Sequence, residues 1–326
     1  MAESLIAKMD DPTHRVVCPH CGTESRLAPA GDEPESDAGL GEDAPEFPDE
    51  EAAFRARVAE RIERQDFEVP LLPHVALRVI RLAGDAKSSM QDLAKVILTD
   101  QGIAARVLKI ANSPVYAGAA PARTINQAVV RLGQREIKDM MLAIAMQTRI
   151  FKSAAYHKRA RRLWEHAVGV AIAARVVANA LRLGREEVFL AGLMHDLGKM
   201  ILLNVLERAQ KDAGGYKPSD ATVDDLIERH HAGLGELLVL TWDLPDLCAE
   251  AIRFIHHEVD GEVSREAAAV ALANDICEAK GIGLDAVTVD PAAGAGYEKL
   301  ALTPDALEEL IRRFDDMFAQ AKASFL

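Results

Sequence analysis

Apolar residues recur at three- and four-residue spacing through almost the whole chain after residue 52, and this spacing most constrains the fold. It places apolar side chains on one stripe of an α-helix, whereas a half-buried strand needs strict alternation. No segment offers convincing alternation. Residues 52–326 are therefore predicted to form an all-α array. We expect a first lobe at about 66–150, a second lobe at about 153–285 and a C-terminal helix at about 304–322.

Polar residues and glycine indicate where several of these helices begin and end. Ser89 and Asp100 each precede an apolar-periodic stretch. Their side-chain oxygens can accept hydrogen bonds from the free N–H groups of a first helical turn, so both are predicted N-caps. Gly133 interrupts the pattern that runs from Thr124 to Ile150. A helix boundary is expected at this glycine.

The composition is that of a soluble globular protein with a sizeable core. Hydrophobic residues make up 49% of the 326 residues and charged residues 27%. Aromatic residues are only 5%, which disfavours an all-β sandwich. The length predicts two domains, or one domain with appendages.

An acidic segment separates the N-terminus from the helical region. Between Arg26 and Arg55 there is no basic residue, and ten acidic residues are interleaved with proline and glycine. Residues 28–51 are therefore predicted to be a disordered linker. The segment accounts for most of the formal net charge of −13. The rest of the chain is nearly balanced, and we expect no nucleic-acid binding through bulk charge.

The chain is expected to be cytoplasmic. Its N-terminus carries Glu3 and Asp10 and lacks the basic and apolar regions of a signal peptide. The most apolar segment, Val168–Leu183, is interrupted by Arg175 and Arg182, so no membrane insertion is expected. Four cysteines are too few for a disulfide scaffold of this size.

Two of these cysteines form a CxxC pair near the N-terminus. Cys18 and Cys21 look like the first knuckle of a zinc ribbon, in which a tight turn aims both thiolates at one ion. The second CxxC is missing. Residues 1–27 are interpreted as a short, irregular, partly zinc-ribbon-like segment. Bound zinc and a metal-free half-site both remain open. Cys248 and Cys277 are expected to be core thiols.

The dipeptide His195-Asp196 is the most informative candidate for chemistry. It follows one apolar helix and begins another, so a bend there can direct an imidazole and a carboxylate at one cation. An isolated pair is equally explained by a capping Asp beside a core His. The same lobe, however, also holds His166, His231, His256, His257 and Asp275. Such groups on apolar helices are costly to bury unless they are paired or bind metal.

The order of His166, His195-Asp196 and Asp275 resembles the HD superfamily of metal-dependent phosphohydrolases. Residues of about 66–265 more specifically resemble an HDOD domain, through the stretches Pro70–Pro73, Asp100–Lys109, Ile125–Gly133, Gly192–Gly198 and Trp242–Pro245. This resemblance implies a two-lobed helical fold. It also implies a role in bacterial signal transduction, since HDOD domains often lack metal ligands and act as regulatory or scaffolding modules.

The second lobe is also similar to the HD-GYP phosphodiesterases. That similarity implies one metal held by His166, His195 and Asp275, and a second held by His231 with His256 or His257. Asp196 would bridge the two ions, and Lys199 stands where that group has a lysine that meets a phosphate. Glu262-Val263-Ser264 stands in place of the Gly-Tyr-Pro motif, which argues against cyclic di-GMP as the substrate.

Two functions follow from these features. The first is a regulatory HDOD protein with a retained metal site that binds signalling proteins or a phosphorylated small molecule. The second is a metal-dependent phosphohydrolase acting on a nucleotide or cyclic dinucleotide, with Asp196 and Lys199 in catalytic roles. Imidazole and carboxylate ligands suit Fe, Mn, Zn or Ni. Hydrolysis of a generic phosphodiester distinguishes the two functions.

Overall fold

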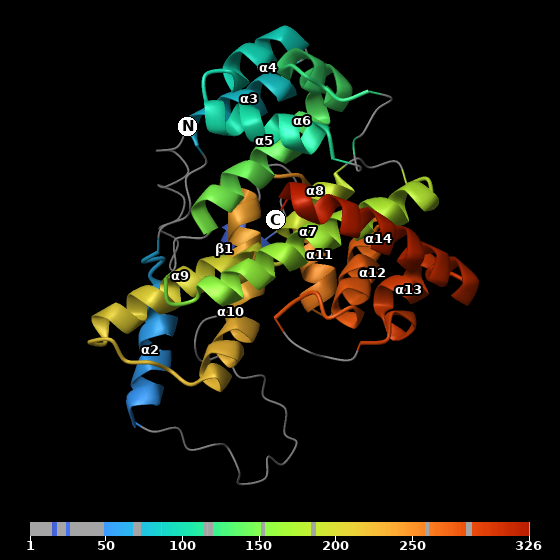
Figure 1. Ribbon diagram of the computed structural model, residues 1–326. Helices are drawn as coiled ribbons and strands as arrows, with labels where there is room; N and C mark the ends of the chain where they lie inside the picture. The colour runs from blue at the N-terminus through green and yellow to red at the C-terminus, as the bar shows by residue number, and fades with distance from the viewer. Residues whose placement is uncertain are drawn as a thin grey trace. The chain divides into compact units, whose positions relative to one another are not determined.

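The computed structural model describes residues 15–17, 24–26, 49–67, 73–85, 87–113, 116, 120–150, 154–183, 187–257, 261–284 and 289–325. Helices dominate these residues (Figure 1), which confirms the predicted all-α class. The chain divides into two compact units, each built from two stretches of sequence. The first unit is Met1–Val69 with Asp196–Leu244, and the second is Pro70–His195 with Pro245–Leu326. The division passes between His195 and Asp196.

The first unit contains a pair of long helices with a third helix packed against them. Its elements are β1 (Arg15–Val17), β2 (Glu24–Arg26), α2 (Asp49–Glu63), α9 (Leu197–Asp212) and α10 (Asp220–Thr241). Helix α9 packs along α10, and α2 lies against both (Figure 1). Strands β1 and β2 form a short antiparallel pair that the sequence pattern does not predict.

Helix α2 is held by an apolar stripe. Phe54, Val58 and Ile62 follow each other at four-residue spacing and are all buried. This spacing puts them on one face of the helix. Burial of side chains of this size contributes about 1.5–3 kcal/mol each. The helix is therefore part of the folded unit.

Polar contacts fix the start of α2 on α10. The buried carboxylate of Glu51 accepts hydrogen bonds from the hydroxyls of Ser219 and Thr222, each at 2.5 Å. One turn later, Arg55 pairs with Asp225 and donates to Thr222 Oγ1 at 2.9 Å. These bonds satisfy Glu51 away from water, where an unpaired carboxylate would be costly.

The second unit contains the remaining helices. They are α3 (His74–Gly84), α4 (Met90–Ile97), α5 (Gln101–Ala111), α6 (Ile125–Ile150), α7 (His157–Ala180), α8 (Val188–Met194), α11 (Asp246–His256), α12 (Arg265–Ala279), the 3₁₀ helix η1 (Pro291–Ala293), α13 (Ala295–Leu300) and α14 (Pro304–Phe325). Helices α3, α4 and α5 pack on α6, whereas α7 packs against α8, α12 and α14. Helix α7 is buried over most of its length and is the core of this unit.

Local signals in the sequence correctly mark several helix ends in this unit. Ser89 caps α4 in a reciprocal capping box with Asp92. Asp100 caps α5 by accepting from the N–H of Ile103 at 3.0 Å. Gly133 interrupts α6 with φ of 80°, a conformation that strongly favours glycine. The expected helix boundary is therefore a kink between two helical segments.

An ionic cluster joins α6 to α7. Arg175 on α7 makes a two-pronged contact with Glu136 on α6, at 2.9 and 3.0 Å, and its guanidinium lies 4.6 Å from the ring centre of Tyr116. Asp139, one turn after Glu136, is 8% exposed. Burial raises the pKa of Asp139 to about 8, and the charge of Glu136 adds to the shift. Asp139 is therefore largely protonated at neutral pH.

Replacing Asp139 by Asn should change how stability depends on pH. Below about pH 4 the aspartic acid is protonated in the folded and unfolded states, so its pKa shift costs nothing there. Between about pH 4 and pH 8 the unfolded carboxyl ionises while the folded one keeps its proton. The wild type should therefore lose up to about 1.4 kcal/mol of stability per pH unit relative to Asp139→Asn. Urea unfolding across this range measures the difference, and parallel profiles would contradict the prediction.

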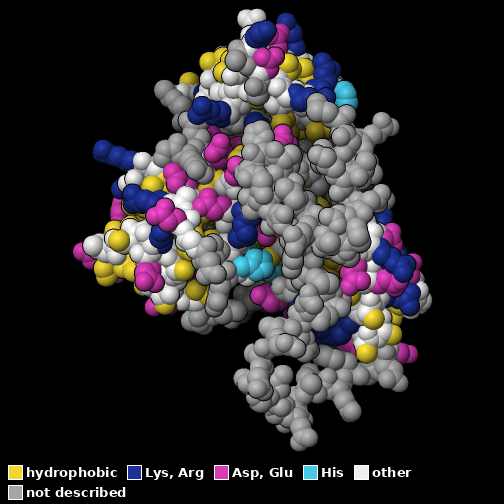
Figure 2. All heavy atoms as spheres, turned by 180° about the vertical axis from the view of Figure 1, so that it is seen from behind, with side chains coloured by type: hydrophobic (Ala, Val, Ile, Leu, Met, Phe, Trp, Pro, Cys, Tyr) yellow, Lys and Arg dark blue, Asp and Glu magenta, His cyan; other side chains and the backbone are white. Residues whose placement is uncertain are grey.

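One long apolar stretch of the described chain lies within the fold. Val188–Asp212 is long and apolar enough to cross a membrane, but 89% of its most apolar window is buried inside the structure. A core segment of a soluble protein has the same properties. On the face shown in Figure 2, basic and acidic side chains are interspersed and hydrophobic ones are scattered.

The N-terminal predictions fall mostly on residues that the structure does not describe. Cys18 and Cys21 lie outside the described residues, so zinc binding by this segment stays a prediction. Most of the acidic linker predicted at 28–51 also lies outside them. Helix α2 begins at Asp49 and takes up the end of that range. In contrast, Cys248 and Cys277 are free and buried, as expected for core thiols.

Candidate metal centre

The chain bends at His195 and Asp196, between α8 and α9. Helix α8 ends at Met194, Asp196 is the N-cap of α9, and both side chains are almost fully buried. A Cβ on Gly192 would lie only 2.9 Å from the Cα of Ala171. Because Gly192 has no side chain, α8 can approach α7 closely and bring His195 toward the α7 side chains.

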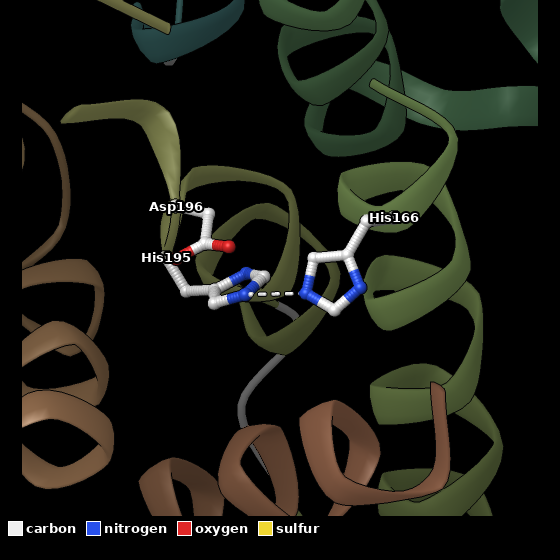
Figure 3. Close-up of side chains that lie close together, drawn as sticks. All are labelled: His166, His195 and Asp196. Carbon is white, nitrogen blue, oxygen red and sulfur yellow. Dashed lines mark hydrogen bonds between the residues drawn. The ribbon is translucent and has the colours of Figure 1, made fainter. Parts of the chain in front are cut away.

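His166 on α7 meets His195 (Figure 3). Its Nε2 lies 3.2 Å from the Nε2 of His195, and both rings are buried. The carboxylate of Asp196 lies beside this pair. One ligand atom from each of the three residues falls within 4.8 Å of the others. Three residues predicted to bind metal are therefore brought together.

The hydrogen bonds of the two imidazoles determine which nitrogen carries the proton. His166 Nδ1 lies 2.6 Å from the carbonyl oxygen of Ile282, and His195 Nδ1 lies 2.7 Å from that of Gly192. A carbonyl only accepts, so each Nδ1 donates and, in the neutral ring, each Nε2 keeps a lone pair. Two lone pairs at 3.2 Å repel each other unless a proton or a metal ion lies between them. This is the arrangement that metal-binding histidines adopt.

Asn274 on α12 faces the same nitrogen of His166. Its Oδ1 lies 3.1 Å from His166 Nε2, while its Nδ2 donates to Glu278 Oε1 at 3.2 Å. Because a carboxylate oxygen accepts, the amide nitrogen must point to Glu278 and the amide oxygen to His166. Asn274 is thus another potential oxygen ligand. Sequence reasoning missed it, although it directly precedes Asp275 on the same helix.

Asp275, the next residue on α12, lies beside Asn274 and against Gly294. Its Oδ2 is only 2.0 Å from the position that a Cβ on Gly294 would occupy, so the carboxylate lies against that glycine. Burial raises the pKa of Asp275 to about 7, with a further contribution from Glu278. Among the described residues, Asp275 is in neither group of side chains whose ligand atoms converge. In the structure it is Asn274 that faces His166, and metal binding by Asp275 stays a prediction.

Asp196 also belongs to a cluster within the first unit. Lys199 Nζ lies 2.9 Å from Asp196 Oδ2, and the two residues are one helical turn apart. A ligand nitrogen of His231 lies within 4.8 Å of an Asp196 carboxylate oxygen. His231 Nδ1 is 2.7 Å from the carbonyl oxygen of Ile227, so its Nε2 also keeps a lone pair in the neutral ring. Asp196 and His231 therefore bring ligand atoms close enough to share a cation.

A close helix crossing positions His231. A Cβ on Gly198 would lie 1.7 Å from the carbonyl oxygen of His231 and 2.7 Å from the backbone nitrogen of Gly235. Helices α9 and α10 can approach this closely because residue 198 has no side chain. The spacing between Asp196 and His231 therefore depends on Gly198.

The two histidines at the end of α11 differ in their surroundings. The ring of His256 is nearly parallel to that of His195, with ring centres 6.3 Å apart. His257 is the exposed C-cap of α11, and neither of the convergent groups found among the described residues includes it. Of the two alternatives from the sequence, the geometry favours His256.

Two residues of the first lobe have structural roles. Arg131 donates to the carbonyl oxygen of Ala111 and to Asn112 Oδ1, at 3.0 and 3.1 Å. Asn112 also bonds the backbone of Ala122 in both directions. These bonds close the end of α5 against the start of α6 and point to no ligand.

Comparisons with known proteins agree with this architecture. A family model described as HDOD domain matches residues 69–258, which is more than half of the chain. Two solved structures share the fold at 22% identity. One, from Shewanella amazonensis SB2B, is named "Putative metal-dependent phosphohydrolase", has a TM-score of 0.68 and aligns over 85% of this chain and 99% of its own. The other, an HDOD domain protein of unknown function from Geobacter sulfurreducens, has a TM-score of 0.63 and aligns over 83% and 97%.

One curated relative matches part of the chain. It is an uncharacterized protein of Treponema pallidum, 23% identical over 211 residues. The match covers 62% of this chain and 39% of the relative, so the chain spans about two fifths of the relative's length.

Proposed function

Because this chain belongs to the HDOD domain family, we propose that it is a signal-transduction regulator. The site formed by His166, His195 and Asp196, called the HD centre below, would bind a divalent transition metal. The output of the regulator would be the binding of a signalling protein or of a phosphorylated small molecule. His166, His195 and Asp196 would hold the metal, with Asn274 as an additional oxygen ligand. His231 and His256 are the candidates for further ligands or a second ion.

The observation that carries the metal proposal is the pair of imidazole nitrogens at 3.2 Å. Each has its opposite nitrogen engaged with a carbonyl, and the Asn274 oxygen faces one of them. The donor set consists of imidazole nitrogens with a carboxylate and an amide oxygen. Fe, Mn, Zn and Ni accept such mixed ligands.

A regulatory role is supported by the way the first-lobe helices are built into the second unit. Helices α3–α6 belong to the same compact unit as α7, α8, α11 and α12. The contact of Arg175 with Glu136 joins α6 to the helix that carries His166. In the proposed regulator, a change at the imidazole pair would pass through α7 and α6 to the first-lobe helices, where a partner would bind.

Phosphohydrolase activity is the second candidate, and Lys199 favours it. Its ammonium lies 2.9 Å from Asp196, where it could neutralise the charge of a bound phosphate. A bound metal would supply Lewis-acid chemistry and lower the pKa of a coordinated water. Lys199 and Asp196 would then position the phosphate and the ions. The name of the Shewanella amazonensis protein points to the same class of reaction.

Metal removal tests the main proposal. Protein purified without oxygen should contain a transition metal, and chelation should lower its unfolding free energy. Mn²⁺ at about 100 times its Kd should restore about 2.7 kcal/mol, because it binds the folded state. Elemental analysis and urea unfolding measure both effects. His257→Gln serves as the control and should leave the Mn²⁺ response unchanged.

An absence of bound metal together with an absence of Mn²⁺ stabilisation would contradict the proposal. Incubation of the Mn²⁺-loaded and Fe²⁺-loaded protein with bis(p-nitrophenyl) phosphate separates the two candidate functions. Metal binding without release of p-nitrophenol is expected for the regulator. Metal-dependent release that a ligand substitution abolishes would favour the hydrolase.

A further inference from the structure

We infer that Asn274, oriented by Glu278, sets the charge of the HD centre, so that a metal bound there also binds a phosphate-type anion. The inference rests on the proposed metal site. Asn274 would supply a neutral oxygen where a carboxylate would neutralise part of the metal charge. Metal and anion would then bind cooperatively.

The position of the Asn274 oxygen is determined by its neighbours. Asn274 and Glu278 are one turn apart on α12, and the Asn274 amide donates to the Glu278 carboxylate at 3.2 Å. Asn274 is 7% exposed, so its amide has little access to water. His166 is held from its other side by the carbonyl of Ile282. The amide oxygen and the imidazole lone pair are therefore both directed at one position.

The side chains that face this position carry too little negative charge to compensate a divalent ion, and the Glu278 carboxylate is directed at the Asn274 amide nitrogen instead. His166 and His195 each bond a carbonyl through Nδ1 and are neutral when they bind metal through Nε2. Asn274 is neutral. Asp196 is the one anionic member of the described group, and Lys199 lies 2.9 Å from its carboxylate. A bound divalent cation thus keeps an excess of positive charge.

An excess of positive charge in a buried site favours an anion as the next ligand. Electrostatic attraction is strong where water is largely excluded. Phosphate oxygens are hard donors that bind divalent ions, and Lys199 provides a second cationic contact. By linkage, phosphate must raise the affinity for metal by the same factor as metal raises the affinity for phosphate.

The test moves the negative charge of the pair from residue 278 to the ligand position 274 while keeping the hydrogen bond. In Asn274→Asp with Glu278→Gln, the new amide of residue 278 can donate to the new carboxylate of residue 274. Glu278→Gln alone is the matched control, because its Oε1 still accepts from Asn274. Mn²⁺ affinity is measured by titration, with and without saturating inorganic phosphate, for the wild type and each variant.

Phosphate should raise the Mn²⁺ affinity of the wild type about 10-fold, within the usual range of coupling between sites. In the double variant, Mn²⁺ affinity without phosphate should rise about 10-fold and the phosphate effect should fall toward unity. Glu278→Gln alone adds no charge to the ligand set, so its Mn²⁺ affinity should not rise above the wild-type value and its phosphate effect should not fall. Asn274→Ala removes the oxygen without adding charge, so it should weaken Mn²⁺ binding even if the double variant fails to fold.

The results of this experiment distinguish the inference from the proposed metal site on which it rests. A wild type that binds no Mn²⁺ would overturn both. Wild-type Mn²⁺ binding without a phosphate effect would overturn the inference alone. The same holds if Asn274→Ala retains the wild-type affinity for Mn²⁺.

Discussion

Substitution of Gly198 by alanine should destabilise the protein by more than about 4 kcal/mol, a cost that single substitutions rarely reach. The new Cβ would lie 1.7 Å from the carbonyl oxygen of His231 and 2.7 Å from the nitrogen of Gly235. These are backbone atoms of α10, which cannot rotate away as a side chain can. The clash is relieved only if α9 and α10 separate, which would disrupt the packing of two buried helices.

Urea unfolding measures this cost, and Gly102→Ala is the matched control. Gly102 also lies on a helix, but a Cβ there meets only the Asp100 side chain, at 3.3 Å. Its effect should stay within about 1 kcal/mol, in the range of helix propensities. If Gly198→Ala retained wild-type stability, α9 and α10 could not be as close as described. A partly folded Gly198→Ala protein should also bind Mn²⁺ more weakly, because His231 would move relative to Asp196.

The helices could be predicted from sequence because their signals are local. The apolar stripes, the Ser89 and Asp100 caps and the break at Gly133 each depend on neighbours within a few residues. The division into units, in contrast, depends on contacts between residues that are far apart in the sequence. Helix α2 packs on α10 through Glu51 and Ser219, which are 168 positions apart. No local pattern encodes such a pairing.

The candidate site was predictable to the level of its residue types. His195, Asp196 and His166 do converge, because polar side chains on apolar helices need partners. Which α12 side chain faces His166 was not predictable. Adjacent helical residues point about 100° apart, so Asn274 reaches His166 while Asp275 reaches Gly294. Chemical preference favoured the aspartate, whereas helix packing turns the asparagine toward His166. His256 and His257 differ for the same reason.

The neutral Asn274 also bears on the choice between regulator and catalyst. A two-metal phosphodiesterase needs anionic ligands to hold both ions during turnover. Within the described groups, Asp196 supplies the one carboxylate. A site of this charge suits one ion with an exchangeable anion better than two tightly held ions. This charge is an argument for the proposed regulator, and metal-dependent hydrolysis of bis(p-nitrophenyl) phosphate would overturn it.

Asp196→Asn should lower Mn²⁺ affinity by more than about 100-fold. Loss of a hydrogen-bonding residue around a metal ligand typically costs 10- to 100-fold, and loss of a charged ligand should cost more. Asp196 is 2% exposed, so little water is available to replace its charge. Titration of the metal-free protein with Mn²⁺ measures the affinity.

Asp196→Asn also breaks the ion pair with Lys199, so a Lys199 substitution is needed as the control. Asp196→Asn removes the carboxylate that lies 2.9 Å from the Lys199 ammonium, and breaking such a pair can itself destabilise the fold. Combining Asp196→Asn with Lys199→Gln removes both charges, so the fold should be retained while Mn²⁺ affinity stays low. Lys199→Gln alone should bind Mn²⁺ at least as tightly as the wild type, because a repelling cation is gone. Wild-type Mn²⁺ affinity in the folded double variant would exclude Asp196 as a ligand, and the metal centre would have to be built from the histidines and Asn274.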